Sequence, residues 1–276
     1  NMKMKKLLLL SAIVLIYACK DKPEKMTPEE KIMTEPDGGI GKGATSPVMQ
    51  FPTDIEKAHH KANFLEHKAV QFDIILQFSG KERLNAKITT LTNSGKIKIE
   101  KKDSTFLSFD GDKAWIYPAS QNYDGARFDM FTWQYFFALP FKLTDNGTQW
   151  EMPEQRILDS TKVTSARLTF GNDIGDAPDD WYIIYQSEDQ KLAAAAYIVT
   201  LNKEVQTAEA NPHAIKYHDY KMVDGVPFAT KWTFHNWSKE NGIEDEIGEA
   251  KISNIEFINT DSNFFKARQK AGEIKK

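Results

Sequence analysis

The chain of 276 residues has a single cysteine, Cys19, and none of the short motifs that mark common catalytic sites. One cysteine excludes an internal disulfide framework, a cysteine-based zinc site and, beyond residue 19, a thiol nucleophile. The patterns GxSxG, HExxH, Walker A and EF-hand do not occur, and no glycine-rich loop joins a strand to a helix. We therefore expect neither a metal nor a cofactor. The enzyme class left open is a hydrolase with a carboxylate or histidine pair that no motif reveals.

The sequence also lacks a surplus of positive charge, since 36 basic residues stand against 39 acidic ones and the net charge is -3. Proteins that bind nucleic acid usually carry a basic surplus, so the charge argues against such a partner. Hydrophobic residues make up 41% of the chain, which is enough for one sizeable core. We expect a monomer.

Long hydrophobic runs are missing too, because the longest covers ten residues, 7–16, about half of the roughly 20 that a membrane-spanning helix needs. Three lysines precede this run, and together they predict a signal peptide over residues 1–18. The residues Ile16-Tyr17-Ala18-Cys19 resemble the bacterial lipobox, whose cysteine is diacylated. An ordinary signal peptide followed by a chance cysteine is the alternative.

Lipidation of Cys19 would attach the protein to a membrane without crossing it, since two acyl chains anchor stably where one does not. We expect an outer membrane lipoprotein of the cell envelope that faces the periplasm or the cell surface. Residues 19–50 are rich in Lys, Glu, Pro and Gly, which predicts a lipidated flexible tether ahead of a folded domain over residues 51–276. Without residues 1–18 the net charge becomes -6.

The folded part is predicted to be mainly β. Apolar residues alternate with polar ones from residue 70 onward, and turn signals such as Asp224-Gly225 separate the alternating runs. This spacing predicts roughly a dozen antiparallel strands. The predicted strands are Phe72 to Phe78, Leu84 to Leu91, Ile97 to Ile99, Phe106 to Phe109, Lys113 to Tyr117, Trp150 to Leu158, Val163 to Phe170, Trp181 to Gln186, Ala194 to Leu201, Ile215 to Val223, Phe228 to Trp237 and Ile247 to Ile258.

Two helices are predicted beside the strands. Thr53 and Glu56 have the spacing of a capping box, and apolar residues then recur at helical spacing as far as Ala69, which predicts one amphipathic helix. The segment from Arg127 to Leu139 is rich in large apolar residues and ends at Pro140, which predicts a buried helix or lid.

The hairpin that turns at Asp224-Gly225 has one face of aromatic and aliphatic residues, interrupted by Asp219. Such a face is either plain core or the lining of an apolar cavity, and both interpretations remain open. The residues that we predict to line a cavity come from this hairpin and from the apolar helix. They are Phe131, Trp133, Tyr135, Phe136, Phe137, Tyr217, Phe228, Trp232 and Phe234.

Three stretches together are similar to a known family. They are residues 133–148 (WQYFFALPFKLTDNGT), residues 217–228 (YHDYKMVDGVPF), and Trp232, Trp237 and residues 250–255. The chain resembles uncharacterised Bacteroidetes lipoproteins whose domains are similar to the lipoprotein carriers LolA and LolB. The resemblance covers approximately residues 54–258. It implies an unclosed antiparallel β-barrel with helices on its concave face and an apolar interior that holds acyl chains.

The polar candidates are weaker. Glu56 and His60 share a helix face and could form part of a metal clip, but solvated polar residues explain them as well. Pairing of Val223 with Val226 places His218 and His235 about 13 Å apart, too far for joint metal ligation. Residues 172–180 hold several carboxylates, which could bind calcium or simply form an acidic turn. Ser104 and Ser160 lie in weak O-glycosylation sequons.

Three functional hypotheses follow. The first is a membrane-anchored, non-catalytic lipoprotein that binds a lipid, an acyl chain or another apolar ligand in a half-barrel cavity. The second is an envelope module for protein or glycan contacts, with a core filled by side chains. The third is the hydrolase.

Overall fold

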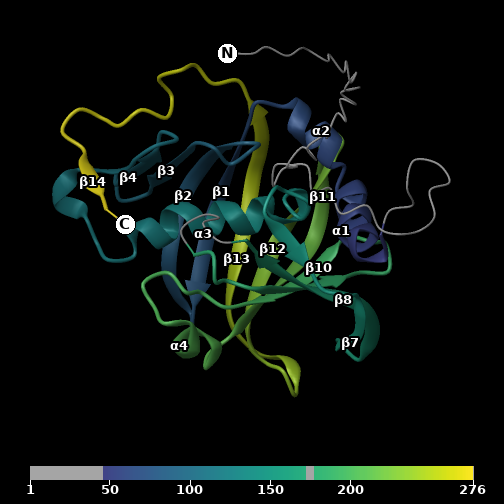
Figure 1. Cartoon of the computed structure of the whole chain (residues 1–276). Helices are drawn as coiled ribbons and strands as arrows, with labels where there is room; N and C mark the ends of the chain where they lie inside the picture. The colour runs from purple at the N-terminus through teal and green to yellow at the C-terminus, as the bar shows by residue number, and fades with distance from the viewer. Residues whose placement is uncertain (1–45, 172–176, 276) are drawn as a thin grey trace, which may run out of the picture. The chain divides into compact units, whose positions relative to one another are not determined.

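The computed structural model describes residues 46–171 and 177–275 of the chain. Within them the strands form one antiparallel sheet of 14 strands, in the order β14-β5-β4-β3-β2-β1-β13-β12-β11-β10-β9-β8-β6, with β7 added beside β8. The two ends of this order, β14 and β6, do not pair with each other, so the barrel is unclosed. The helix α3 lies across the face of the sheet in Figure 1, in front of β1, β2 and β13. The predicted mainly-β fold, an unclosed antiparallel barrel with helices on one face, is confirmed.

The helices and strands have these bounds: α1 Pro47–Ala58, α2 Lys61–Glu66, β1 Ala69–Phe78, β2 Lys81–Leu91, β3 Ile97–Lys101, β4 Phe106–Phe109, β5 Ala114–Tyr117, α3 Ala126–Ala138, β6 Thr148–Trp150, β7 Glu154–Leu158, β8 Thr161–Phe170, β9 Tyr182–Gln186, β10 Leu192–Tyr197, α4 Val205–Glu209, β11 His213–Val223, β12 Val226–Ser238, β13 Gly242–Ile258 and β14 Gly272–Ile274. Short 3-10 turns, η2 Ala119–Gln121 and η3 Leu139–Phe141, flank α3.

The predicted strands are present, but the one expected from Ala194 to Leu201 ends at Tyr197, another is divided in two, and one strand was not predicted. The strand expected from Trp150 to Leu158 is two strands, β6 and β7, which pair with the two halves of β8. Pro153 lies between them, and a proline cannot continue a ladder of hydrogen bonds. The strand β14, which pairs with β5, was not predicted, because its three residues are too few to show a period.

The N-terminal helix differs from the prediction. It begins at Pro47, before the predicted start of the domain, and ends at Ala58. The Thr53 hydroxyl donates to the Met49 carbonyl one turn earlier, at 2.7 Å, so the predicted capping box does not exist. His60 adopts a left-handed conformation (φ 56°), which separates α1 from α2, and Ala69 already belongs to β1. Proline is favoured in the first helical turn, and this signal outweighs the Thr53 spacing.

The hairpin β11–β12 has the predicted register. Val223 pairs with Val226, His218 with Lys231 and Ala214 with His235. Asp224 and Gly225 both have positive φ angles, 47° and 78°, as a two-residue turn between twisted strands requires. A side chain at residue 225 would also meet Asn63 of α2, whose Nδ2 atom lies 2.8 Å from the Cβ position.

The sheet buries apolar side chains on both of its faces. The larger cluster lies between the sheet and α1, α2 and α3. A second cluster lies on the opposite face, where Leu158 and Val163 of the β7–β8 hairpin pack against it. It consists of Trp181, Ile183, Tyr185, Ala194, Ala196, Ile198, Ala208, Ala214 and Trp237. Burial on both faces explains why β9 reads as a continuous hydrophobic run rather than an alternating one.

Gly248 allows β13 to pass close to β1. A Cβ atom at this residue would lie 2.5 Å from the Gln77 carbonyl oxygen and would overlap the Phe78 ring. We expect Gly248→Ala to lower the free energy of unfolding by about 1–3 kcal/mol, as overpacking does. Urea unfolding would measure the loss. Gly171→Ala is the control, because a Cβ atom there makes ordinary contacts at 3.8 Å. Equal stability of both variants would contradict the prediction.

Candidate ligand-binding site

The helix α3 covers the concave face with aromatic side chains that reach strands from β4 to β9 in the order of the sheet. Phe137 stacks on Phe72 of β1 with ring centroids 3.9 Å apart, and Phe131 meets Phe109 of β4 at 5.1 Å. At the other side Tyr135 meets Tyr182 of β9 at 5.7 Å. The apolar segment predicted as a buried helix or lid is therefore a helix that spans the open face.

The nine residues predicted to line a cavity all belong to the cluster beneath and within α3. Seven of them are buried, and Phe131 and Tyr135 are partly buried at its margin. Tyr217 also donates its hydroxyl to the Phe136 carbonyl at 3.0 Å, which ties β11 to α3. The structure thus brings the predicted residues of the hairpin and the helix together, and their role in ligand binding remains a prediction.

A buried carboxylate anchors the N-terminal end of α3. Asp129 is fully buried and accepts two hydrogen bonds from Arg83 of β2, at 2.8 and 3.1 Å. Tyr123 Oη and Trp133 Nε1 donate to the same carboxylate at 2.6 and 2.8 Å. Burial and the charge of Asp129 raise the pKa of the Tyr123 hydroxyl well above its ordinary value, so it stays a donor. No sequence pattern indicated this carboxylate, because Arg83 lies 46 residues away in the chain.

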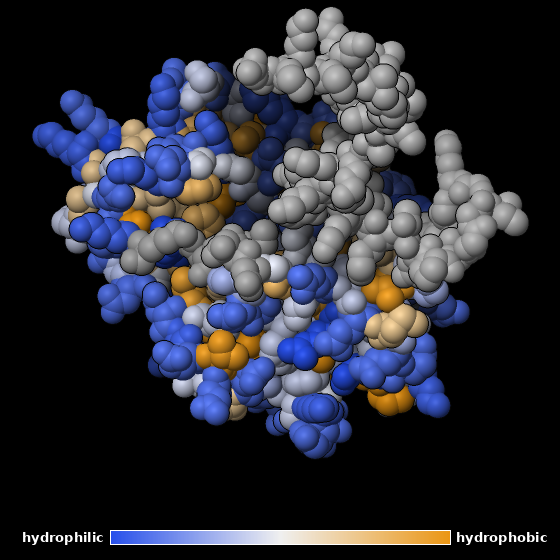
Figure 2. All heavy atoms as spheres, viewed as in Figure 1, coloured by the Kyte–Doolittle hydropathy of each residue, from blue (hydrophilic) through white to orange (hydrophobic). Residues whose placement is uncertain are grey.

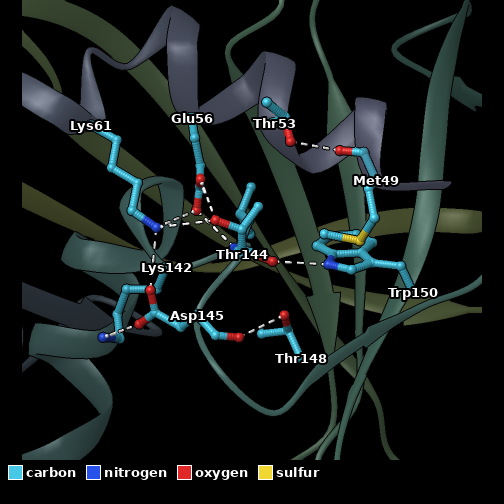
Figure 3. Close-up of polar contacts among 10 residues, drawn as sticks. Met49, Thr53, Glu56, Lys61, Lys142, Thr144, Asp145, Thr148 and Trp150 are labelled. Atoms are coloured by element: carbon cyan, nitrogen blue, oxygen red, sulfur yellow. Dashed lines mark hydrogen bonds and ion pairs between the residues drawn. The ribbon is translucent and has the colours of Figure 1, made fainter. Parts of the chain in front are cut away.

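A second group of polar contacts holds the segment that follows α3 (Figure 3). The buried Glu56 carboxylate of α1 accepts the Thr144 backbone N–H at 2.8 Å and the Thr144 hydroxyl at 2.7 Å. Lys61 donates to Glu56 at 2.9 Å and to Asp145 at 3.3 Å, and Asp145 also pairs with Lys142 at 2.7 Å. Charged groups thus hold α3 near its N-terminal end and hold the segment that follows its C-terminal end, and we call α3 a strap across the sheet.

His59 directly follows α1 and lies between η3 and β11. Its place on the predicted amphipathic helix gives no sign of burial, but it is fully buried and touches the rings of Phe141 and Tyr220. Its Nε2 atom accepts the Leu192 N–H at 3.0 Å, and burial lowers its pKa to about 3. The imidazole is therefore neutral and serves as an acceptor for the backbone. His60 instead lies at the Gly225 carbonyl, so Glu56 and His60 form no metal clip.

Two other histidines come closer together than their backbone positions indicated. His218 Nε2 and His235 Nε2 each lie 2.9 Å from the Thr233 hydroxyl on the outer face of the sheet. The predicted separation of about 13 Å is wrong for the side chains, because both lean along the strands toward Thr233. No group of three or more His, Cys, Asp or Glu residues in the described ranges could hold a metal ion.

Several predicted features fall outside the site. Cys19, the signal peptide, most of the tether and residues 172–176 of the acidic loop lie outside the described residues. Asp180 of that loop accepts the N–H and hydroxyl of Thr200, and burial raises its pKa to about 6. Ser104 and Ser160 are exposed in turns, and their modification stays a prediction. No helix among the described residues is both long and apolar enough to cross a membrane.

Among the described residues, buried side chains fill most of the space beneath α3. A void there, lined by residues such as Phe137, Tyr217 and Trp232, has a volume of about 10 Å³. A void of this size holds about one water molecule, so no acyl chain fits in it while α3 lies in place. The open apolar interior expected from the sequence is therefore occupied by the aromatic side chains of α3.

A much larger cleft, of about 900 Å³, opens where the β11–β12 hairpin separates from β13. Its lining residues come from the end of β11, the middle of β12 and residues 249–255 of β13, and Tyr220 is common to this cleft and the small void beneath α3. Neither the cleft nor the inward position of Tyr220 was predicted from the sequence. The proline at residue 227, next to a predicted strand, was the one available signal, because proline interrupts strand pairing.

The fold is similar to that of several solved structures. No family model and no curated protein matches the chain. A LolA superfamily protein from Nitrosomonas europaea matches with a TM-score of 0.51 and 11% identity, over 81% of this chain and 99% of that one.

Two further structures match more weakly. One is a putative outer membrane lipoprotein-sorting protein domain from Vibrio parahaemolyticus (TM-score 0.44, 12% identity, 76% of this chain and 97% of that one). The other is a DUF1329 family protein from Desulfovibrio piger (TM-score 0.45, 10% identity, 80% and 98%). At these identities the likeness concerns the fold, and the chain has the fold of a LolA superfamily protein, as the sequence resemblance predicted.

Proposed function

We propose that this protein is a non-catalytic, membrane-anchored lipoprotein of the cell envelope that binds a lipid, an acyl chain or another apolar ligand in its half-barrel. The supporting observation is the strap α3, which buries aromatic side chains on an otherwise open concave sheet and is fastened by charged contacts at its two ends. Cys19 supplies the acyl anchor in this proposal. The LolA superfamily likeness agrees with such a role and by itself concerns only the fold.

Ligand binding in this proposal requires α3 to move aside. The side chains Met130, Trp133, Phe136 and Phe137 are buried beneath it, and exposing four such side chains costs about 6–12 kcal/mol. An acyl chain of about 15 methylene groups regains roughly 12 kcal/mol when it is buried, at about 0.8 kcal/mol for each group. The exchange is therefore close to balanced, which is what reversible carriage of a lipid needs.

A second candidate function is an envelope module that contacts proteins or glycans and keeps its interior filled. The void of about 10 Å³ beneath α3 favours this alternative. It would also need an exposed aromatic patch, but the exposed large hydrophobic residues in the described ranges are Met49, Leu65, Ile75, Met152, Ile157, Val205 and Met222, none of them aromatic. On the face seen in Figure 2, hydrophobic residues form separate groups among hydrophilic ones.

Quenching of tryptophan fluorescence by a dibrominated fatty acid tests the carrier function in the full chain. Bromine quenches only tryptophans that it approaches, and Trp133 is buried on the concave side whereas Trp237 is buried on the opposite face. We expect quenching that Trp133→Phe reduces and Trp237→Phe leaves in place. Native mass spectrometry of the acylated protein should also show a bound lipid. No quenching and no bound lipid would favour the second candidate function.

A further inference from the structure

The cleft beside β13 arises because the sheet comes apart at one place. The β12–β13 ladder begins at the pair Lys231 and Lys251, so residues 226–230 of β12 have no partner on β13. These residues follow β11 instead, and the end of the hairpin is drawn toward α2, where Asn63 Nδ2 donates to the Asp224 carbonyl at 3.0 Å. In Figure 1, β13 and β11 run apart as they approach α2.

A local distortion of β11 gives the cleft its apolar floor. Asp219 has a positive φ of 55° and is skipped in the pairing of the hairpin. Beyond it Tyr220 lies inside, against His59, with its hydroxyl bound to the Leu192 carbonyl at 2.6 Å. The floor of the cleft consists of Tyr220, Val223, Ala250, Ile252 and Ile255. Its volume of about 900 Å³ lies within the range of about 300–1,000 Å³ that is typical of ligand pockets.

The rim of the cleft is charged and has one more cation than anion. It carries Lys221, Lys231 and Lys251 together with Asp219 and Glu249. Lys231 lies 3.8 Å from Glu249, so these two charges largely offset each other. Among the described residues neither Lys221 nor Lys251 has an ion-pair partner, and both side chains are exposed. The rim therefore offers two ammonium groups without ion-pair partners above an apolar floor.

An added peptide strand fits this cleft less well than an acyl chain. Strand addition needs a row of free backbone donors and acceptors along the edge. Pro227 lies in the stretch of β12 that has no partner on β13, and it has no N–H to donate. Its carbonyl faces the His59 imidazole and is therefore not a free acceptor. Proline at an open strand edge is a common way to prevent pairing with another chain.

We propose that this cleft binds an anionic amphiphile, with its carboxylate or phosphate head at Lys221 and Lys251 and its acyl chain on the floor between Tyr220 and Ile252. This inference rests on the proposed function in taking a lipid as the ligand. Tyr220 lines both the cleft and the void beneath α3, so its side chain lies between the proposed acyl chain and the concave face.

Displacement of a fluorescent 16-carbon fatty acid from the full chain, with palmitate as competitor, tests this site. We expect the double variant Lys221→Glu/Lys251→Glu to bind palmitate at least about tenfold more weakly, since two charge-assisted contacts are lost and two repulsions appear. Asp219→Asn should bind palmitate several-fold more tightly, because it removes the rim anion that lacks a cation, and asparagine tolerates a positive φ. Methyl palmitate, which has the chain without the charge, should respond to neither change, and acetate should not compete.

Lys162→Glu is the matched control, because Lys162 is an exposed strand lysine outside the cleft, and it should bind palmitate like the unaltered chain. Circular dichroism would show that all variants remain folded. The cleft is not the binding site if the double variant binds palmitate unchanged while dibrominated fatty acid still quenches Trp133. The proposed function would then stand. No binding of any chain would overturn both. A purified protein that carries a peptide in the cleft instead of a lipid would also overturn the inference.

Discussion

Replacement of Asp129 by alanine is expected to lower the free energy of unfolding by about 3–5 kcal/mol, the cost of removing one partner of a buried ion pair. The carboxylate is fully buried and accepts four hydrogen bonds, two from Arg83 and one each from Tyr123 and Trp133. The variant leaves all of these donors without their acceptor, and the Trp133 N–H is buried where water does not replace it. For a domain of this size the loss corresponds to a fall in Tm of about 10 °C.

Differential scanning calorimetry would measure this loss. Asp124→Ala is the control, because Asp124 is exposed five residues earlier in the chain, and its removal should change stability by no more than about 0.5 kcal/mol. If Asp129→Ala cost no more than the control, Asp129 would not anchor α3. The variant should also release the N-terminal end of the strap, and under the proposed function it should bind dibrominated fatty acid faster than the unaltered chain.

Acidification is expected to destabilise the fold through His59. Its pKa is about 3 in the folded protein and about 6.5 in an unfolded chain, because burial disfavours the imidazolium. The unfolded chain therefore binds an additional proton between these values, and the contribution of neutral His59, complete above pH 6.5, is lost as the pH falls. At pH 4.5 the loss is about 2.7 kcal/mol, at 1.36 kcal/mol for each pH unit.

A comparison with His59→Gln isolates this contribution, because glutamine can still accept the Leu192 N–H and does not titrate. Urea unfolding at pH 7.5 and pH 4.5 should show that the stability difference between the two proteins shrinks by about 2.7 kcal/mol at the lower pH. Asp180 acts in the opposite direction, since its pKa is raised to about 6 and the fold gains stability as it is protonated. Its effect is common to both proteins and cancels. Ile99→Val, which removes one buried methyl group, should keep the same difference at both pH values.

The sequence predicted those parts of the fold whose signals are local. The hairpin register followed from the turn Asp224-Gly225, because a two-residue turn fixes every later pair of the two strands. The helix from Arg127 to Leu139 followed from its length and from Pro140 at its end, and the structure places α3 at Ala126–Ala138. The nine aromatic residues proposed for the site share one cluster, because they lie on the buried faces of these two elements.

Local signals failed wherever a residue's environment is made by distant parts of the chain. His59 has the spacing of a surface residue on its helix, yet β10 and Tyr220 enclose it. Asp219 appeared only to interrupt an apolar face, whereas its positive φ turns Tyr220 into the interior. No local sequence pattern indicates that the pairing of β12 with β13 stops at Lys231. The hairpin contact that accompanies it joins Asn63 and Asp224, which are about 160 residues apart in sequence.

By itself the amino-acid sequence determined the class of the fold, the antiparallel strands, the apolar helix and the aromatic character of the concave face, since periodicity, turn residues and composition act over a few neighbouring residues. Only the tertiary structure decided that α3 fills the interior, that Asp129 and Glu56 fasten the ends of the strap, and that a charged cleft opens beside β13. These features depend on how far an open sheet bends and which distant side chains then meet. Burial, charge pairing and the space left between strands are properties of the assembled chain.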